Sequence, residues 1–477
     1  MAKKEYDAVI VGAGPNGLAA AITLQQAGLS VLLIEGRGKI GGGLRSEELT
    51  LPGFIHDVCS AIHPMALASP FFRSLPLTDF GLEFIQPPVA AAHPFDGGSA
   101  ALLLRSVVET ASAFGIDEKT YFKLIQPLTA GFSGLVNDIL APLHLPNNIW
   151  QFTKFGLNAL QPASMLAGRF SSKEAKGLWG GMAAHSMLPL DKLTTAAIGL
   201  VLLSAGHAHG WPIPKGGSNQ IATALAAYFQ SLGGQIETGA YIKSLQQLPS
   251  STAVLFDVTP RQLLQIAGHT FSSVYQSQLK RYRYGMGVFK VDWALAEPVP
   301  FTNSGCRQAG TVHIGGTFDE VANAEKMNWA GKHPDKPFVL LAQQSIFDTT
   351  RAPKGKHTLW GYCHVPANST LDMTDRIEQQ IERFAPGFRD RILTRHTMNT
   401  EQMEEYNPNY IGGDINGGAQ TLSQLFTRPA LRWSPYRTST KGLYICSSST
   451  PPGGGVHGMC GYHAAQRVLK DLFPQHS

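Results

Sequence analysis

Three glycines near the start of the chain have the types and the spacing of a phosphate-binding turn. Gly12, Gly14 and Gly17 form a Gly-x-Gly-x-x-Gly motif directly after "YDAVIVG", a short apolar run that predicts a buried parallel strand. In such a motif the first glycine permits a tight turn, the second lets a phosphate approach the backbone, and the third lets helix and strand pack closely. The next run, "LAAAITLQQAG", predicts a helix whose N-terminus favours an anion.

A carboxylate follows where a dinucleotide-binding unit places a ribose-binding acid. "SVLLIE" predicts a second strand that ends at Glu35, close to the spacing of about 20 residues expected after the turn. Because an acid here disfavours a 2′-phosphate, the pattern favours FAD or NAD over NADP. A glycine-rich turn without a ligand is the alternative, but the combination of strand, helix, second strand and acid argues against it.

A second glycine cluster helps to decide between FAD and NAD. Gly41, Gly42 and Gly43 come shortly after Glu35. An ordinary NAD dehydrogenase has no reason to place glycines there, whereas FAD lies extended and needs a second loop that can approach it. We therefore expect FAD, held as a resident cofactor rather than as a passing substrate.

Two further stretches resemble a known family. The stretch "GGGLRSEELTLPGFIHDVCSAIHP" resembles the phytoene desaturase-like flavoproteins, a branch of the amine oxidase and desaturase superfamily, and so does the closing stretch "KGLYICSSSTPPGGGVHGMCGYHAAQRVLKDLF". The resemblance implies that this closing segment returns to the FAD domain, near the ribityl-pyrophosphate and the pyrimidine edge of the flavin. The family usually has Gly-Ala or Gly-Asp where this chain has Ser447 and Ser448, so we expect altered contacts rather than lost binding.

A third stretch extends the resemblance to the middle of the chain. "PKGG" before an amphipathic helix and "GGQIET" leading into a strand are typical of the superfamily, and they imply that Ile242 lies by the adenine. The cofactor-binding residues expected from the motif and the resemblance are Gly12, Gly14, Pro15, Asn16, Gly17, Glu35, Gly36, Arg37, Gly42, Gly43, Leu44, Ile242, Ser447, Ser448, Gly454, Gly455, Val456 and His457.

The separation of these segments predicts a discontinuous domain. We expect an α/β fold with a Rossmann-type FAD-binding domain over residues 1–100, 205–285 and 405–477. Residues 101–204 and 286–404 would then form an α+β substrate-binding domain with a mixed sheet and a helical cap. Apolar residues at three-to-four spacing after residue 105 predict helices, whereas "RYGMGVFKVDWAL", "KPFVLLAQQSIF" and "HTLWGYCHVP" predict strands.

Composition limits the classes of partner. The chain has 477 residues, of which 43% are hydrophobic and 15% are charged, against the quarter (about 25%) usual in soluble domains. This low charge indicates extensive buried surface or a large apolar cavity. The net charge of +5 is scattered, without a dense basic run, so we expect no nucleic-acid partner, while peripheral contact with anionic lipid stays open. The five cysteines form no Cys-x-x-Cys pair, so we expect no metal site and a cytoplasmic setting.

One segment leaves two interpretations open. Residues 147–170 mix aromatic side chains with Lys154 and Arg169. Such a segment can be a lid or membrane-surface patch at the mouth of a lipid-binding tunnel. The alternative is a core helix with its turn.

The expected chemistry follows from the flavin. A bound flavin carries the redox chemistry, and the protein supplies position, electrostatics and exclusion of water. We expect a dehydrogenase or desaturase that passes hydride from an apolar substrate, carotenoid-, isoprenoid- or lipid-like, to the flavin, with oxygen or a quinone as the electron acceptor. The polar candidates for catalysis are His56, Asp57 and His457, for which hydrogen bonding within loops is the alternative.

Three other functions compete with this one. A flavin amine oxidase and a carotenoid ketolase are enzymes of similar sequence. A lipid- or prenyl-protein-binding escort would use the same fold without redox chemistry. The complete set of motif residues, with Gly12, Gly14, Gly17, Glu35 and the C-terminal glycine-rich loop all present, favours an enzyme over an escort. The oligomeric state stays open.

Overall fold

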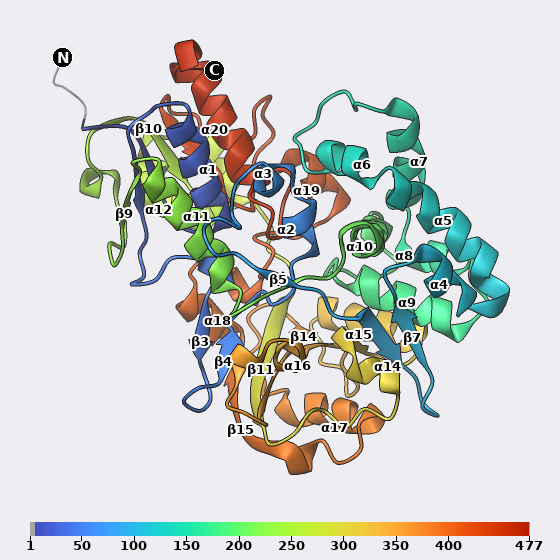
Figure 1. Ribbon diagram of the computed structural model, residues 1–477. Helices are drawn as coiled ribbons and strands as arrows, with labels where there is room; N and C mark the ends of the chain where they lie inside the picture. The colour runs from blue at the N-terminus through green and yellow to red at the C-terminus, as the bar shows by residue number, and fades with distance from the viewer. Residues whose placement is uncertain (1–4, 477) are drawn as a thin grey trace.

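Two separate β-sheets organise the chain, and helices cover both of them (Figure 1). The computed structural model describes residues 5–476. The first sheet has five strands in the order β16-β10-β1-β2-β9, and all of its pairs are parallel. Its strands are β1 (Tyr6–Val11), β2 (Val31–Ile34), β9 (Gln235–Glu237), β10 (Ser251–Phe256) and β16 (Leu443–Ile445).

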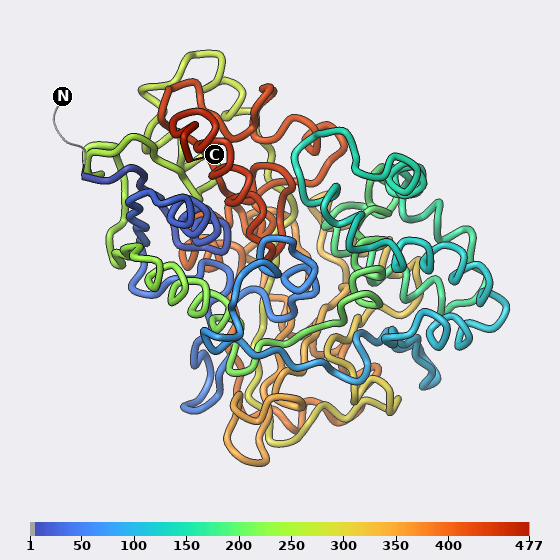
Figure 2. The backbone as a smooth tube through the Cα atoms, turned by 45° about the horizontal axis from the view of Figure 1, so that its top comes forward, coloured from blue at the N-terminus to red at the C-terminus, as the bar shows by residue number. Residues whose placement is uncertain are grey.

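Helices from distant parts of the chain pack on this first sheet. The helix α1 (Pro15–Gln26) contacts α11 (Asn219–Ser231) and α20 (Met459–Leu472), and Figure 2 shows the last helix, in red, beside the first, in dark blue. The approach is so close that a Cβ on Gly461 would overlap the carbonyl oxygen of Asn16. On the other side, α12 (Pro260–Ala267) and α13 (Ser273–Lys280) join a second apolar cluster. The expected Rossmann-type fold is confirmed, and its strands and helices come from separate segments of the chain.

The second sheet is mixed, as expected. Its seven strands follow the order β15-β11-β14-β13-β12-β6-β7, and only the pair β12–β6 is parallel within the described residues. Its strands are β6 (Val89–Pro94), β7 (Ala100–Leu103), β11 (Gly287–Leu295), β12 (Ala309–Ile314), β13 (Val339–Ala342), β14 (His357–Val365) and β15 (Ile392–Met398).

A group of helices caps the second sheet, on the right in Figure 1. Glycines let one of them, α9 (Lys173–Ala184), approach the strands, since a Cβ on Gly177 would overlap the ring of Phe95 and one on Gly181 would lie 2.6 Å from the ring of His313. The cap consists of α4 (Val107–Ser112), α5 (Glu118–Ala130), α6 (Phe132–Ile139), α7 (Ile149–Ala159), α8 (Ala163–Ala167), α9 (Lys173–Ala184) and α10 (Thr195–His209).

Shorter elements connect the two sheets, and two longer helices cover the second. The longer helices are α15 (Phe318–Trp329) and α17 (Thr374–Phe384). The short elements are β3 (Ser46–Glu48), β4 (Ile55–Asp57), β5 (Phe84–Ile85), β8 (Ile213–Pro214), α2 (Pro64–Ala68), α3 (Pro70–Arg73), α14 (Ser304–Arg307), α16 (Gln344–Phe347), α18 (Thr400–Tyr406) and α19 (Leu422–Thr427).

The chain passes from one sheet to the other earlier than the predicted boundary at residue 100. Strand β6 begins at Val89 and pairs with β12 in the second sheet. Its sequence, "VAAAHP", is rich in alanine and has a single β-branched residue, so it carries little strand signal. At the next boundary, α10 runs across residues 204 and 205 without a break. The division of the whole chain into two domains stays a prediction.

Candidate functional site

The turn between β1 and α1 is built so tightly that glycine is required. Gly12 has a φ of 103°, a left-handed value that favours glycine, and a Cβ there would lie 2.9 Å from the carbonyl oxygen of Asp257. A Cβ on Gly17 would overlap the carbonyl oxygen of Gly12. Pro15 starts α1 with the fixed φ that suits a first helical position. The N-terminus of α1 therefore lies directly over the end of β1.

The buried carboxyl of Asp257, at the end of the neighbouring strand, contacts the N-terminus of α1. Asp257 follows β10, and its Oδ2 accepts a hydrogen bond from the backbone N–H of Gly17 at 2.9 Å. Burial raises the pKa of Asp257 to about 7. The nearby charge of Glu35 also raises this pKa, whereas the hydrogen bond from Gly17 lowers it. A phosphate at the same helix end would meet a carboxyl that is largely protonated below neutral pH. The sequence analysis missed Asp257, although a polar residue at the carboxyl end of a parallel strand was a usable signal.

Glu35 ties the end of β2 to the turn. Its two carboxylate oxygens accept hydrogen bonds from the backbone N–H groups of Ala13 and Arg37, at 3.0 and 2.9 Å. The guanidinium of Arg45 adds an ion pair at 3.1 Å, and the side chains of both partners are buried. The carboxylate is thereby held at one place beside the glycine turn.

Two cavities meet at the turn. The smaller, of about 100 Å³, is lined by Glu35, Gly36, Arg37 and Ile242 among others. The larger, of about 310 Å³, extends toward the second sheet. The residues that line both are Gly14, Gly42, Asp257, Asn407 and Asn409. The two cavities therefore lie side by side at the start of α1, and we refer to them together as the path.

Most of the expected cofactor-binding residues line this path, although they come from distant segments. Those that do are Gly12, Gly14, Pro15, Asn16, Glu35, Gly36, Arg37, Gly42, Gly43, Ile242, Ser448, Gly454, Gly455 and Val456.

The other four expected residues lie behind the path. Gly17 packs on the turn, and Leu44 is buried in the core of the first domain. The Ser447 hydroxyl accepts a hydrogen bond from the N–H of Ser449 at 3.3 Å. His457 accepts a hydrogen bond from the N–H of Met459 through Nδ1, at the start of α20. Their roles as direct cofactor ligands stay predictions.

The far end of the larger cavity is mainly apolar and aromatic. Leu202, Trp211, Leu340, Trp360 and Tyr362 line it. The rings of Trp360 and Tyr362 meet edge to face, with centroids 5.1 Å apart and planes at 89°. Leu202 comes from the helical cap, Leu340, Trp360 and Tyr362 come from strands of the second sheet, and Trp211 follows α10. Because Gly14 and Pro15 line the same cavity, it lies between the two halves of the molecule.

A histidine pair stands in this apolar wall. His185 follows α9 and lines the cavity, and its Nε2 lies 3.0 Å from the Nε2 of His313 on β12. Burial lowers the pKa of His185 to about 3 and holds the pKa of His313 well below its usual value. Both rings are therefore neutral at physiological pH, and one donates its Nε2 proton to the other. No motif in the sequence pointed to this pair.

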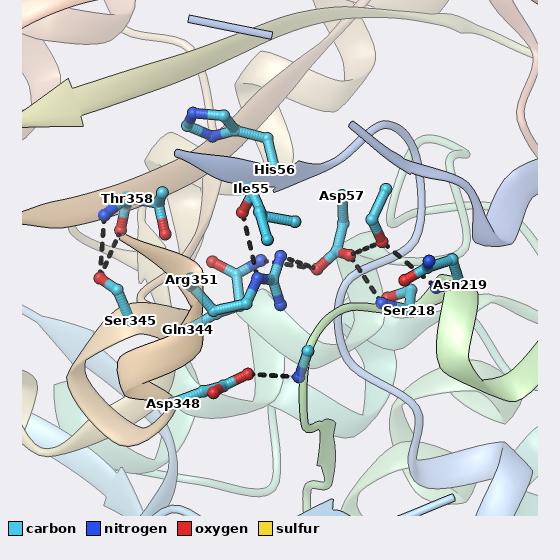
Figure 3. A network of polar contacts seen from close by, with 12 residues as sticks. Ile55, His56, Asp57, Ser218, Asn219, Gln344, Ser345, Asp348, Arg351 and Thr358 are labelled. Carbon is cyan, nitrogen blue, oxygen red and sulfur yellow. Dashed lines mark hydrogen bonds and ion pairs between the residues drawn. The ribbon is translucent and has the colours of Figure 1, made fainter. Parts of the chain in front are cut away.

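His56 belongs to a charged cluster behind Trp360 rather than to the cavity wall. Lys290 and Asp292, both on β11, form a buried ion pair, and Nδ1 of His56 lies 3.5 Å from Asp292. The Lys290 ammonium lies 5.8 Å from the centre of the Trp360 ring. Burial, assisted by the nearby cations, lowers the pKa of His56 to about 3. In Figure 3, His56 points away from Asp57, its neighbour on β4.

Asp57 is the centre of a buried network that joins the two halves of the molecule (Figure 3). Its carboxylate accepts hydrogen bonds from Arg351 at 2.9 Å, Ser46 at 2.6 Å, the backbone of Ser218 at 2.8 Å and Gln344 at 3.2 Å. Burial alone would raise the pKa of Asp57, but Arg351 and these hydrogen bonds hold the pKa below its usual value. With every lone pair engaged, Asp57 positions elements, and its catalytic role stays an untested prediction.

Relatives of known name cover nearly the whole chain. Residues 10–75 match the model of an NAD(P)-binding Rossmann-like domain. The chain is 25% identical to the pyridine nucleotide-disulfide oxidoreductase domain-containing protein 2 of Rattus norvegicus, over 98% of this chain and 94% of that protein. It is 22% identical to the lycopene-forming phytoene desaturase of a Paracoccus species, over 98% and 97% of the two chains.

Solved structures share the fold. An oxidoreductase from Methanosarcina mazei superposes with a TM-score of 0.65 at 15% identity, over 97% of this chain and 99% of that chain. A putrescine oxidase bound to putrescine superposes with a TM-score of 0.62 at 17% identity, over 98% and 99%. With its sequence relatives and the glycine turn of its first sheet, the chain is similar to the phytoene desaturase-like oxidoreductases, relatives that suggest a flavin-type cofactor, and it shares the fold of the solved oxidases.

Proposed function

We propose that this chain is an FAD-dependent dehydrogenase or desaturase that takes hydride from an apolar substrate of the carotenoid, isoprenoid or lipid kind. One observation carries the proposal. The cavity at the dinucleotide turn shares Gly14 and Gly42 with a larger cavity, whose far end is walled by aliphatic and aromatic side chains. The larger cavity would place an apolar substrate next to one end of the bound dinucleotide.

The residues along the path fit FAD. Glu35, Gly36, Arg37 and Ile242 would hold its adenosine half, and the glycines at 42–43 and 454–455 would face its flavin half. Asn16, which lines the larger cavity, has a buried Oδ1 with no hydrogen-bond partner among residues 5–476. A buried orphan acceptor is costly, and a donor on a bound cofactor would satisfy it.

The chain's own residues would divide the remaining work. When bound, the flavin supplies the two-electron oxidation by accepting hydride from a substrate carbon. The walls around Trp360 and Tyr362 bind the substrate and exclude water. The substrate must also lose a proton from the neighbouring carbon for a double bond to form. His185, neutral in the tautomer that donates Nε2–H to His313, would accept this proton on its Nδ1.

A His185→Gln variant tests the role of that proton acceptor. We expect kcat to fall by about 100-fold or more, the usual loss for a general base, while flavin content and KM stay near those of the wild type. Because the pKa of His185 is lowered to about 3, the wild-type kcat should stay level between about pH 5 and 8. The control is His269→Gln at an exposed position. An unchanged kcat in His185→Gln would assign the proton to another group.

The cofactor and substrate class can be tested on the purified protein. We expect the absorption bands of an oxidised flavin and the release of FAD on denaturation. Under anaerobic conditions an acyclic polyene or cyclic terpene should bleach these bands, and oxygen or a quinone should restore them. A colourless protein that refuses added FAD would favour the escort alternative, whereas bleaching by primary amines alone would favour an amine oxidase.

The amine oxidase alternative has one feature in its favour, the aromatic pair Trp360 and Tyr362 in the cavity wall. Aromatic faces attract cations and amines. Lys290, however, already lies over the Trp360 ring, and the two rings meet edge to face instead of facing each other. Among the described residues that line the larger cavity, the one acid is Asp257, at the dinucleotide turn. The wall therefore suits an apolar substrate better.

A further inference from the structure

An arginine is buried behind the C-terminal glycine-rich loop, residues 446–458 between β16 and α20. Arg428 directly follows α19, and it is only 2% exposed. Protein atoms alone bury it, and no helix within residues 5–476 is long and apolar enough to cross a bilayer. A guanidinium is charged at every physiological pH, and a buried charge is normally paired with an acid. A negative charge is therefore expected beside Arg428.

No acid within residues 5–476 forms an ion pair with this arginine. Among these residues its guanidinium donates one side-chain hydrogen bond, from Nη2 of Arg428 to the hydroxyl of Tyr282 at 3.0 Å. The Nε atom of Arg428 is buried without a hydrogen-bond partner there. By contrast, the buried Arg351 has the carboxylate of Asp57 at 2.9 Å. Arg428 is thus a buried cation without a paired acid.

The titratable groups around Arg428 do not fully cancel its charge. Burial raises the pKa of Tyr282, and it raises the pKa of the Cys460 thiol to about 12, so both groups are neutral at physiological pH. The Asp414 carboxylate is also buried nearby, but its oxygens accept hydrogen bonds from two backbone N–H groups, at 2.7 and 2.8 Å. Burial raises the pKa of Asp414, although the charge of Arg428 acts against this rise. Asp414 therefore offsets the cation only in part, from beyond ion-pair distance.

The guanidinium lies against the backbone of the C-terminal glycine-rich loop. A Cβ on Gly453 would lie 2.6 Å from Nη1 of Arg428, so the absence of a side chain permits this approach. The next residues of the loop, Gly454 and Gly455, line the larger cavity, whereas Arg428 lies behind them and outside the cavity lining. One layer of backbone therefore separates the cation from the part of the cavity that would face the flavin.

We propose that Arg428 is an electrostatic residue of the flavin site, whose buried charge stabilises the negative charge that the flavin gains on reduction. The inference rests on the proposed function. When a C–H bond of the substrate breaks, its hydrogen and both electrons pass to the flavin, which thereby gains one negative charge. In a low-dielectric interior a cation acts over several ångströms. Arg428 should therefore make the bound flavin easier to reduce.

A phosphate of the cofactor is the other anion that would balance this cation. The pyrophosphate is expected at the N-terminus of α1, beside Gly14, whereas the loop at Gly453 continues into the residues expected at the flavin. Arg428 lines neither cavity, so it has no direct access to a phosphate in them. Its position therefore favours an effect on the flavin through the electric field.

Redox titration of the FAD-loaded protein tests the proposal. We expect Arg428→Met to shift the midpoint potential of the bound flavin to more negative values, and Arg428→Lys to restore most of the wild-type value. Sulfite adds to an oxidised flavin and leaves a negative charge on it, so the dissociation constant of sulfite should rise by about tenfold or more in Arg428→Met. Arg432→Met removes the same charge from an exposed position in the same segment, where solvent screens it, and is the matched control.

The other results overturn the proposal. Arg428→Gln keeps hydrogen-bond donors without the charge, so its comparison with Arg428→Lys holds even if the methionine variant does not fold. An unchanged potential and sulfite affinity in a folded, FAD-loaded neutral variant, or an equal shift in Arg432→Met, would overturn the inference and leave the proposed function intact. Weaker FAD binding with an unchanged potential would assign the charge to a phosphate instead. Wild-type protein that binds no FAD would overturn the proposed function, and this inference with it.

Discussion

A Gly17→Ala variant should purify with almost no flavin. A Cβ at this position would overlap the carbonyl oxygen of Gly12 and lie 3.0 Å from its carbon, so backbone must move. The movement displaces the N-terminus of α1 and the hydrogen bond from Gly17 to Asp257. Overpacking of this kind costs roughly 1–3 kcal/mol. At the upper end the cost corresponds to a loss of about 150-fold in cofactor affinity.

The measurement is the flavin content after purification, followed by titration of the apoprotein with FAD. Gly38→Ala is the matched control, because a Cβ at Gly38 would meet nothing within 4 Å although the position lies close to Glu35. Full flavin occupancy in Gly17→Ala would contradict the assignment of this turn as the cofactor site. Equal losses in both variants would point to a general effect on folding.

An Arg351→Met variant should be strongly destabilised at neutral pH. The substitution leaves the Asp57 carboxylate, which is fully buried, without its cation. Removing one partner of a buried pair typically costs about 3–5 kcal/mol. Because the network joins β4 to α16 and the residues after it, the variant should also lose the coupling between the two halves of the molecule. The denaturant midpoint and the melting temperature measure the loss.

The pH dependence of this loss has a definite sign. In the wild type the folded pKa of Asp57 is depressed, so the pair stabilises the protein above the unfolded pKa of about 3.9 and ceases to do so as pH falls through the folded pKa. Without Arg351, burial dominates and raises the pKa, so the variant's deficit should grow as pH rises from about 4 toward neutrality.

Two controls interpret the result. Lys215→Met breaks an exposed ion pair with Glu83 and should leave the midpoint unchanged. The double variant Asp57→Asn, Arg351→Met should be more stable than Arg351→Met at neutral pH, because it leaves no buried charge. If Arg351→Met were as stable as Lys215→Met, the buried pair would contribute nothing to the joining of the two halves.

Local patterns explain which elements were predictable. The strand "YDAVIVG", the three glycines and the following helix are continuous in sequence, and the structure has them as β1, the turn and α1. The sequence also predicted the strands β11 and β14, which have nine residues each. Strand β6 was missed because alanine gives little strand signal. The run "KPFVLLAQQSIF" forms a strand only as far as Ala342, and α16 follows.

The polar side chains of the site were harder to predict, because their partners are remote. Asp257 binds the N–H of a residue 240 positions away, and His185 meets a histidine 128 positions away. Neither residue lies in a spaced motif, so only the packed structure brings the partners together. Conversely, Leu44 lies within a glycine-rich stretch that suggested cofactor contact, yet its side chain faces the core.

The order of strands in the first sheet constrains how this protein folds during synthesis. Strand β16 pairs with β10, and α20 packs against α1, the first helix of the chain. A nascent chain that has already made the glycine turn must therefore wait for residues 443–472 before its first sheet and core are complete. Until then, apolar faces of α1 and β10 have no native cover, and such intermediates aggregate readily. We infer that chaperone dependence should be highest late in translation, when most of the chain has left the ribosome but its last helix has not.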